Sequence, residues 1–402
     1  MPSLNKPQAL RLEGHLIALQ DFLRDELAPF YLAEIPDSES GGYRVLQKSE
    51  ESSEQDEKVV LIEHVDTFRA CAELYRNGIG GDAMLELARN GMEYLLDRFC
   101  DSVHGGWFRT LEQDGTPADS SKCLYGHARV LQALSEYAMA SGDPRAPEWA
   151  VSTFQTCQTF AADNRSGGYY EHFARDWSPA PEEHGPARKS FRSHTNFLYA
   201  LTSQYEATGA SIYARKSAEL LQLISARFLH PEHGTGIPWC APDWSPMEGA
   251  IEEGVRSDDA REGCAPVEAD ETHYGWNMAF AATVAHSRKL LEEEMFPEIP
   301  LLRSLYVNTL LWGVDLEKGR VFRAGPQGRP VVESAYAGQD EHWATLTGLL
   351  DAFALYEDPR YLDAYESVFS SIGPGIVEGA STQPSSVRWL LRLEEQLLKI
   401  TL

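Results

Sequence analysis

The fold is decided by residues 83–99 (AMLELARNGMEYLLDRF), by the turn Gly105-Gly106-Trp107 that follows them, and by residues 124–140 (LYGHARVLQALSEYAMA). Apolar residues recur every three or four positions in both stretches, which predicts two amphipathic helices. Two such helices joined through a glycine turn form a helical hairpin. We therefore take this hairpin as the building unit of the chain.

The glycine turn recurs along the chain. Gly41-Gly42-Tyr43 and Gly167-Gly168-Tyr169 repeat it, and His233-Gly234-Thr235-Gly236-Ile237 is a looser copy, so successive turns lie 62 to 67 residues apart. Similar tails follow two of the turns, DGTP at 114–117 and DWSP at 176–179, and DWSP returns at 243–246. Further helical patterns cover residues 195–206, 213–228, 277–292, 300–313, 343–356 and 360–371.

A single hairpin cannot bury its own apolar face, so repeated hairpins must stack or close on one another. Units of about sixty residues allow roughly six hairpins in a chain of this length. We therefore expect an all-α fold, an (α/α)6 barrel of six helical hairpins with long mouth loops, as one domain over residues 1–402. An open solenoid is the alternative.

The composition narrows the class of protein. The chain has 402 residues, of which 43% are hydrophobic, and 61 acidic against 35 basic residues give a formal charge of −26. A protein that binds nucleic acid or an anionic membrane presents a basic surface, so neither partner is expected. The sequence contains no apolar run long enough to span a membrane, and its N-terminus lacks a signal-peptide core, so we expect a cytoplasmic protein.

No cofactor or metal is indicated. The six cysteines form no CxxC pair, which speaks against a zinc site and favours reduced thiols. No nucleotide-binding glycine loop is present. Residues 245–270 are acidic and rich in glycine and proline, and they are read either as a lid over the barrel mouth or as a disordered insertion.

The chain resembles the N-acylglucosamine 2-epimerase family, which includes cellobiose 2-epimerases and mannose isomerases. The resemblance extends over nearly the whole chain, through residues 101–117 with the HGGW turn, KCLYGHARVLQALSEYAMASGD at 122–143, GGYYEHFARDWSP at 167–179, RSHTNFLYALTSQYEATG at 192–209 and YGWNMA at 274–279. It implies an (α/α)6 barrel that moves a proton next to a carbonyl carbon. A small-molecule substrate and a monomer or homodimer are implied as well.

The resemblance breaks at the catalytic positions. The family uses two histidines supported by a glutamate and an arginine. The first histidine falls on Trp276, its glutamate falls on Ala279, and the family arginine of the first inner helix falls on Asp66. The second histidine belongs to a motif of which residues 385–388 (SSVR) keep only the arginine.

A further family motif is only partly kept. Its first histidine survives as His194, whereas its glutamate becomes Tyr199. Another family glutamate falls on Ala344, while Tyr125 matches a family site tyrosine. Ordinary sugar 2-epimerisation by the family mechanism is therefore not expected.

Other ionisable groups stand at these inner-helix positions. Histidine beside a carboxylate is the commonest acid–base pair at neutral pH, although a lone helical histidine also fits a structural, hydrogen-bonded group. The residues expected to carry catalysis are His64, Asp66, His194, Asp340, Glu341 and His342.

Aromatic and polar residues at the expected mouth suit substrate binding, although Trp107 also fits a brace for its glycine turn. Trp276 and Tyr199 replace charged groups, which favours a larger and less polar ligand than a free sugar. The residues expected to bind substrate are Trp107, Tyr125, His127, Tyr170, Arg192, Asn196, Tyr199, His273, Trp276, Asn277 and Trp343.

Three functions remain open. The first is a repurposed enzyme, a lyase or cyclase of specialised natural-product biosynthesis, that removes a proton next to a carbonyl. The second is a sugar 2-epimerase or aldose–ketose isomerase with a relocated acid–base pair. The third is a non-catalytic binding module on the same barrel.

Overall fold

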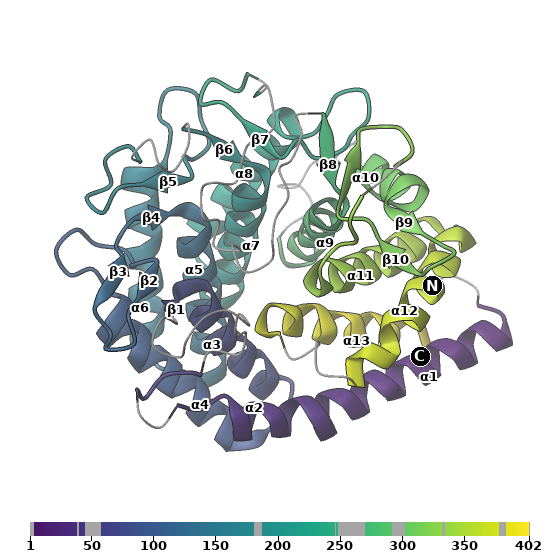
Figure 1. Ribbon diagram of the computed structural model, residues 1–402, viewed down its shortest axis with the longest axis horizontal. Helices are drawn as coiled ribbons and strands as arrows, with labels where there is room; N and C mark the ends of the chain where they lie inside the picture. The colour runs from purple at the N-terminus through teal and green to yellow at the C-terminus, as the bar shows by residue number, and fades with distance from the viewer. Residues whose placement is uncertain are drawn as a thin grey trace. The chain divides into compact units, whose positions relative to one another are not determined.

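The computed structural model describes residues 4–37, 40–44, 58–180, 187–245, 247, 270–291, 302–331, 334–377 and 383–401 (Figure 1). Most of the expected lid at 245–270 thus lies outside the described residues. None of the helices in these ranges is both long and apolar enough to cross a lipid bilayer.

The chain divides into two compact units. Unit 1 comprises Met1–Pro29, Ser225–Pro238 and Asp270–Leu402, and unit 2 comprises Phe30–Ile224 and Trp239–Ala269. The expectation of one domain over residues 1–402 stays a prediction.

Unit 2 is built on three helices that contact one another in sequence, α3 (Leu61–Arg76), α5 (Leu124–Ser141) and α7 (Phe191–Thr208). The outer helices α4 (Gly81–Tyr94) and α6 (Arg145–Thr156) pack on α3 and α5 (Figure 1). The three inner helices are buried on nearly all sides over their first three turns, as expected for helices inside a two-layered fold. The remaining helical segments are α2 (Ala28–Glu34), η2 (Leu95–Phe99), η3 (Cys157–Ala161) and α8 (Ser211–Arg227).

Unit 1 repeats the plan. Its inner helices are α9 (Tyr274–Leu290), α11 (Gln339–Tyr356) and α13 (Val387–Thr401), and α11 contacts the other two. On their outer sides α10 (Leu302–Asn308) packs on α9, α12 (Pro359–Val377) on α11, and α1 (Lys6–Asp21) on α13. Shorter helical segments are η1 (Phe22–Leu27), η6 (Thr309–Gly313) and η7 (Pro384–Ser386).

Short antiparallel strands precede the N-terminal ends of four inner helices. A strand leads directly into α3, α5, α7 and α9, and each of these strands pairs with a strand from a later mouth loop. In unit 2 the sheets are β1 (Val59–Val60) with β2 (Thr110–Leu111) and β3 (Pro117–Asp119), β4 (Lys122–Cys123) with β5 (His172–Phe173), and β6 (Lys189–Ser190) with β7 (Trp239–Cys240). In unit 1 they are β8 (Glu271–His273) with β11 (Ala324–Pro326), and β9 (Val314–Asp315) with β10 (Arg320–Val321).

A histidine near the start of an inner helix bonds the glycine turn that precedes it. His127 is the fourth residue of α5; its Nδ1 lies 2.7 Å from the Cys123 carbonyl oxygen, and its Nε2 accepts the Trp107 N–H at 3.2 Å. His194, the fourth residue of α7, repeats this with the Ser190 carbonyl at 2.7 Å and the Tyr169 N–H at 3.0 Å.

Unit 1 uses the same device. His342 is the fourth residue of α11, and its ring joins the Gly338 carbonyl at 2.8 Å to the Val321 N–H at 3.1 Å. In α9 the fourth residue is Asn277, whose Oδ1 accepts the Gly236 N–H at 2.9 Å. The fourth position thus links each of these inner helices to the turn before it.

The repeated sequence motifs follow from this contact. Gly106 has a φ of 72°, and a Cβ there would lie 2.5 Å from His127 Nε2 and 2.7 Å from the Trp177 ring. Trp177 belongs to the first DWSP tail, and its Nε1 donates to the His104 carbonyl at 3.2 Å. Glycine is therefore required where the tail, the turn and the histidine meet.

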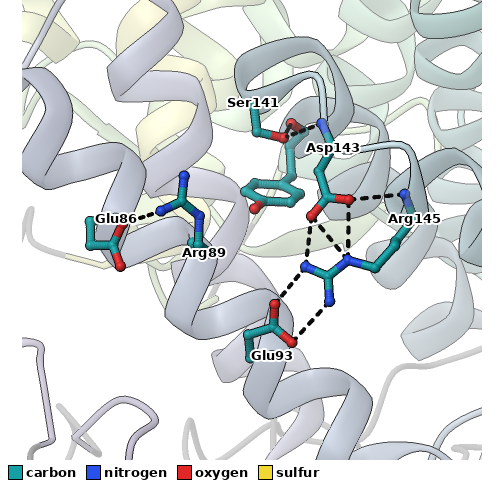
Figure 2. A network of polar contacts seen from close by, with 7 residues as sticks. Glu86, Arg89, Glu93, Ser141, Asp143 and Arg145 are labelled. Carbon is teal, nitrogen blue, oxygen red and sulfur yellow. Dashed lines mark hydrogen bonds and ion pairs between the residues drawn. The ribbon is translucent and has the colours of Figure 1, made fainter.

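A surface network fastens the junction between α5 and α6. Arg145 pairs with Asp143 at 2.7 Å and with Glu93 of α4 at 2.5 Å, while Arg89 pairs separately with Glu86 (Figure 2). These side chains are about half exposed apart from Asp143, so each pair contributes at most about 1 kcal/mol to stability.

We predict that His194→Leu lowers the free energy of unfolding by about 1–3 kcal/mol, because it leaves the buried Tyr169 N–H without a partner and removes the second of two bonds to the Ser190 carbonyl. His194→Asn should cost less, since Asn277 fills this position in α9. Urea denaturation at pH 7 checks both variants, with His104→Leu at an exposed histidine as the matched control. Equal stability of His194→Leu and the control would contradict the account.

Burial lowers the pKa of His194 to about 4. The unfolded chain takes up this proton near pH 6.5, whereas the native chain does so only near pH 4, so His194 makes stability fall as the pH drops from 6.5 to 4. Urea denaturation across this window should show a shallower loss for His194→Asn than for the wild type. An unchanged slope would contradict the neutral, buried ring.

Candidate functional site

The inner helices of unit 2 share a polar face. Its residues occupy the second, sixth and ninth positions of α5 and α7 and the sixth and ninth positions of α3, and this spacing places them on one side of each helix. We call this set the polar face of unit 2. It consists of Asp66 and Arg69 on α3, Tyr125, Arg129 and Gln132 on α5, and Arg192, Asn196 and Tyr199 on α7.

The centre of the polar face is a buried ion pair. Asp66 Oδ1 accepts hydrogen bonds from Arg129 Nε at 2.8 Å and from Arg129 Nη2. Arg129 Nη1 donates to Gln132 Oε1 at 3.1 Å and to Asn196 Oδ1 at 3.3 Å. The guanidinium is 2% exposed, and it therefore holds three inner helices together through one charged group.

One oxygen of Asp66 remains available. All hydrogen bonds to this carboxylate from the described residues, and the 4.0 Å contact with Arg69 Nε, fall on Oδ1. The side chain still keeps 7% of its accessible surface. A carboxylate held at one oxygen and open at the other is oriented for a second partner.

A tyrosine–arginine pair lies one helical turn nearer the N-terminal ends of these helices, about 6 Å along the axis from Asp66. Arg192 Nη2 donates to the Tyr125 hydroxyl at 3.1 Å, and its guanidinium carbon lies 4.5 Å from the centre of the Tyr125 ring. Both side chains are partly exposed. The pair presents a positive charge and a hydroxyl beside the open end of the polar face.

Toward the C-terminal ends of α3 and α5, the inner helices of unit 2 are more strongly charged. Arg69 is fully buried, and although burial opposes its charge, Glu73 at 2.6 Å and Asp66 raise its pKa above the ordinary range. Glu136 of α5 pairs with Arg76. Burial, and after it the charge of Glu73, raises the pKa of Glu136 to about 7.

Unit 1 carries a different inner face. The sixth positions of α9 and α11 are Ala279 and Ala344. Trp276 is partly exposed and stacks on His273 with ring centres 3.9 Å apart. The sixth positions of α9 and α11 are thus apolar, whereas the sixth positions of the inner helices of unit 2 are charged or polar.

The acidic residues at the start of α11 have local contacts. Glu341 accepts the Gly338 N–H at 3.1 Å in a capping box, and Asp340 lies in the same first turn. The neighbouring Trp343 is 2% exposed. Carboxylates are favoured at a helix N-terminus, so this pair also stabilises α11.

His64, expected as a proton carrier, lies in an aromatic enclosure. Its Nε2 lies 2.9 Å from the Gly91 carbonyl, and its ring stacks on Tyr43 with centres 4.8 Å apart. Burial lowers its pKa to about 4, so the ring is neutral at pH 7. These contacts give His64 a place in the packing rather than on the polar face.

The other predicted histidines and several predicted binding residues also serve the scaffold. Both ring nitrogens of His127, His194 and His342 bond backbone groups, as described above, and Asn277 holds a glycine turn. Trp107 is 1% exposed and donates from Nε1 to Thr153 Oγ1 of α6 at 3.1 Å. A direct role in catalysis or binding stays a prediction for these residues, and their contacts do not support it.

The structure thus brings Asp66, Tyr125, Arg192, Asn196 and Tyr199 onto one face of unit 2. Tyr170 is partly exposed, and Lys189 Nζ lies 5.6 Å from the centre of its ring. Arg69, Arg129 and Gln132 were not predicted. Arg129 and Gln132 follow Tyr125 by four and seven residues, so the helical spacing of polar residues carried the signal for both.

The donor sets do not indicate a metal ion. Within the described ranges, no group of three or more histidine, cysteine, aspartate or glutamate side chains lies close enough to hold one.

Helical hairpins whose inner helices are covered by outer helices are the architecture of an (α/α) barrel. The sequence pattern of the N-acylglucosamine 2-epimerase (GlcNAc 2-epimerase) family matches residues 41–372, and the chain belongs to this family. The resemblance inferred from the motifs is confirmed.

Relatives in the family are epimerases and isomerases. Over 219 residues the chain is 27% identical to a cellobiose 2-epimerase of Bacteroides fragilis, which covers 52% of this chain and 55% of the relative. It is 24% identical over 286 residues to a D-mannose isomerase of Thermobifida fusca, and this match covers 70% of this chain and 66% of the relative. The chain spans about half the length of the cellobiose 2-epimerases it matches.

Solved structures confirm the fold. The cellobiose 2-epimerase of Spirochaeta thermophila superposes with a TM-score of 0.81 at 24% identity, covering 99% of this chain and all of that one. A D-mannose isomerase superposes with a TM-score of 0.75 at 17% identity and the same coverage. The expected (α/α)6 barrel is therefore the fold of this protein.

We predict that Asp66→Asn lowers the free energy of unfolding by about 3 kcal/mol, because it leaves the buried Arg129 without a countercharge. The double variant Asp66→Asn with Arg129→Gln should recover part of that loss, since both charges are then removed. Urea denaturation of the wild type, the two single variants and the double variant measures the coupling. Additive losses would contradict a direct buried pair.

Proposed function

We propose that this protein transfers a proton next to a carbonyl group, with the Asp66 carboxylate as the base. The observation that supports this proposal is the geometry of Asp66. Arg129 donates hydrogen bonds to Oδ1, whereas none of the described residues donates one to Oδ2. Orientation of one oxygen by a fixed guanidinium is what a general base needs. The motifs lead us to expect that the family's acid–base histidines are replaced in this chain, the first of them by Trp276, and the proposal therefore places the base at another inner-helix position.

The proposed step is enolisation. Asp66 Oδ2 takes the proton from the carbon next to the carbonyl, the electron pair of that C–H bond forms a carbon–carbon double bond, and the carbonyl oxygen gains the negative charge. The Tyr125 hydroxyl and the Arg192 guanidinium would stabilise this oxygen, since donors aimed at a developing oxyanion lower the barrier. Asp66 then returns its proton to carbon. For isomerisation this is the former carbonyl carbon, and the proton of the adjacent hydroxyl group passes to the oxyanion, so that the new carbonyl forms at the oxygen of that hydroxyl group.

A single base favours isomerisation over epimerisation. Epimerisation returns the proton to the opposite face of the same carbon, which requires a second acid. Isomerisation returns it to the neighbouring carbon on the same face, which one carboxylate can do. The amide and charged groups of the polar face suit a hydroxylated substrate, so we propose an aldose–ketose isomerase, with 2-epimerisation as a side reaction.

Unit 1 supports a second candidate. The Trp276–His273 stack with Ala279 and Ala344 suits a ligand that is less polar than a free sugar, and proton abstraction next to a carbonyl also starts elimination or ring closure. A lyase or cyclase acting on a larger, less polar metabolite therefore stays a proposal. The relatives named as cellobiose 2-epimerase and D-mannose isomerase favour the sugar reaction.

The test is hydrogen exchange with solvent. Incubation with D-mannose, D-fructose or cellobiose in D₂O, followed by ¹H NMR, should show isomerised product and loss of the signal of the hydrogen next to the carbonyl. Asp66→Asn should lower the rate at least about 100-fold, because the amide cannot accept the proton. Asp97→Asn at an exposed carboxylate is the matched control and should retain full activity.

Asp66→Glu separates chemistry from folding. This variant keeps the negative charge beside Arg129, so it should fold and keep measurable activity with a displaced base. Full activity of a folded Asp66→Asn variant would overturn the assignment of the base. Tight sugar binding without any exchange in the wild type would favour the binding module instead.

A further inference from the structure

The C-terminal half of the inner helices in unit 2 contains buried polar atoms without partners. Arg69 is fully buried and bonds Glu73 through Nη1, yet its Nε and Nη2 and Glu73 Oε2 have no hydrogen bond among the described residues. The same holds for Ser203 Oγ and Gln204 Oε1 on α7.

Such atoms require an explanation. Buried donors and acceptors are almost always bonded, and ordered water is their usual partner where protein groups do not reach. Donors and acceptors lie side by side at Arg69, which offers two N–H groups next to an unbonded oxygen of Glu73. Water can bond both kinds of group, whereas an anion would be repelled by Glu73.

The unbonded atoms of Arg69 and Glu73 lie along a continuous line of charged groups on α3. Asp66, Arg69, Glu73 and Arg76 follow one another at intervals of three or four residues, so they run along one side of α3 for about 15 Å. Arg69 Nε lies 4.0 Å from Asp66 Oδ1, and Arg69 Nη1 lies 2.6 Å from Glu73.

The line ends at the surface. Glu136 occupies the thirteenth position of α5, as Glu73 does in α3, and Arg76 bonds Glu136. Arg76 Nη2 then reaches Glu206 of α7 at 3.3 Å. The exposed fraction rises from 0% at the Arg69 side chain to 31% at Arg76, so the last members meet solvent.

We propose that a file of internal water molecules follows α3 from Asp66 to Glu136, and that Glu73 and Glu136 pass protons along it between Asp66 and the solvent at Arg76 and Glu206. This inference deepens the proposed function, because it rests on Asp66 as the base. The substrate of the relay is the proton itself, and its carriers are carboxylates and water. Arg69 keeps its protons and orients the water.

The transfer moves one proton and no other group. The O–H bond of protonated Asp66 breaks as an O–H bond to the first water forms, and each water passes on one of its own protons. The unbonded oxygen of Glu73 gains a proton from one water and releases it to the next, and a carboxylate oxygen of Glu136 gains the last proton. Asp66 returns to the carboxylate that accepts the next proton from substrate. Glu136 then releases its proton to solvent.

The surroundings of Glu136 suit a carrier at neutral pH. Burial and the negative charges of Glu73 and Glu206 raise its pKa, while Arg76 acts in the opposite direction, and the balance lies at about 7. A carrier that gains and loses protons near the working pH is the most efficient one.

The first test needs no substrate. A crystal structure of the full chain at a resolution that shows ordered water should place water within hydrogen-bond distance of Arg69 Nε or Nη2 and of Glu73 Oε2. Infrared titration should find a carboxyl group near neutral pH that disappears in Glu136→Gln and moves to lower pH in Glu73→Gln. An empty site, or the absence of such a carboxyl group, would overturn the proposal.

The second test uses the sugar that turns over in D₂O. The measured quantity is the amount of solvent deuterium that enters the product per turnover. Glu136→Gln should lower this ratio at least about threefold, because the proton taken from substrate then stays on Asp66 and returns to carbon. Glu86→Gln, in the surface network of the outer helix α4, is the matched control and should leave the ratio unchanged (Figure 2).

Together the two tests distinguish a failure of the proton relay from a failure of the proposed function. An unchanged ratio in a folded Glu136→Gln variant refutes the relay while the proposed function stands. Absence of turnover with every sugar refutes the proposed function and with it the relay from Asp66, whereas the crystal structure and the titration still decide whether the water file exists.

Discussion

The bond between an inner helix and the glycine turn before it is the contact on which the rest of the structure depends. In α5, α7, α9 and α11 a side chain at the fourth position accepts a backbone N–H of that turn, and where this residue is histidine the ring also bonds the carbonyl four residues earlier. One imidazole thereby satisfies a buried N–H that would otherwise destabilise the fold, and adds a second bond to a carbonyl that already accepts the first bond of the helix. The requirement for glycine, the DWSP tail and the short strands all follow from the close approach at this point.

These bonds indicate a structural role for the histidines at the start of the inner helices. A histidine whose two ring nitrogens bond the backbone has no nitrogen left to carry a proton for a substrate, and burial lowers the pKa of His194 and His342. The centre of the polar face lies two residues further along α5, where side chains of three neighbouring helices meet at Arg129. Chemistry and scaffold thus alternate along α3, α5 and α7, with His127 and His194 serving the scaffold and Asp66 and Asn196 the polar face.

The fold was predictable and much of the site was not. The spacing of Gly105-Gly106-Trp107 and its copies follows from backbone geometry, which a single sequence shows directly. The pairing of Asp66 with Arg129 joins residues 63 positions apart, and no local pattern indicates it. The resemblance to the family led to the prediction of histidines as catalytic residues. The helical spacing of Tyr125, Arg129 and Gln132, in contrast, indicates the polar face from the sequence alone.

The central claim is that a substrate lies against the polar face of unit 2 with its reacting carbon at Asp66. The most direct measurement is a crystal structure with D-mannitol, an unreactive analogue of the open-chain sugar. The account predicts that Asp66 Oδ2 contacts the first or second carbon of mannitol or its hydroxyl group, and that Tyr125 and Arg192 bind a neighbouring oxygen. Mannitol bound away from Asp66, with Oδ2 covered by protein, would contradict the account.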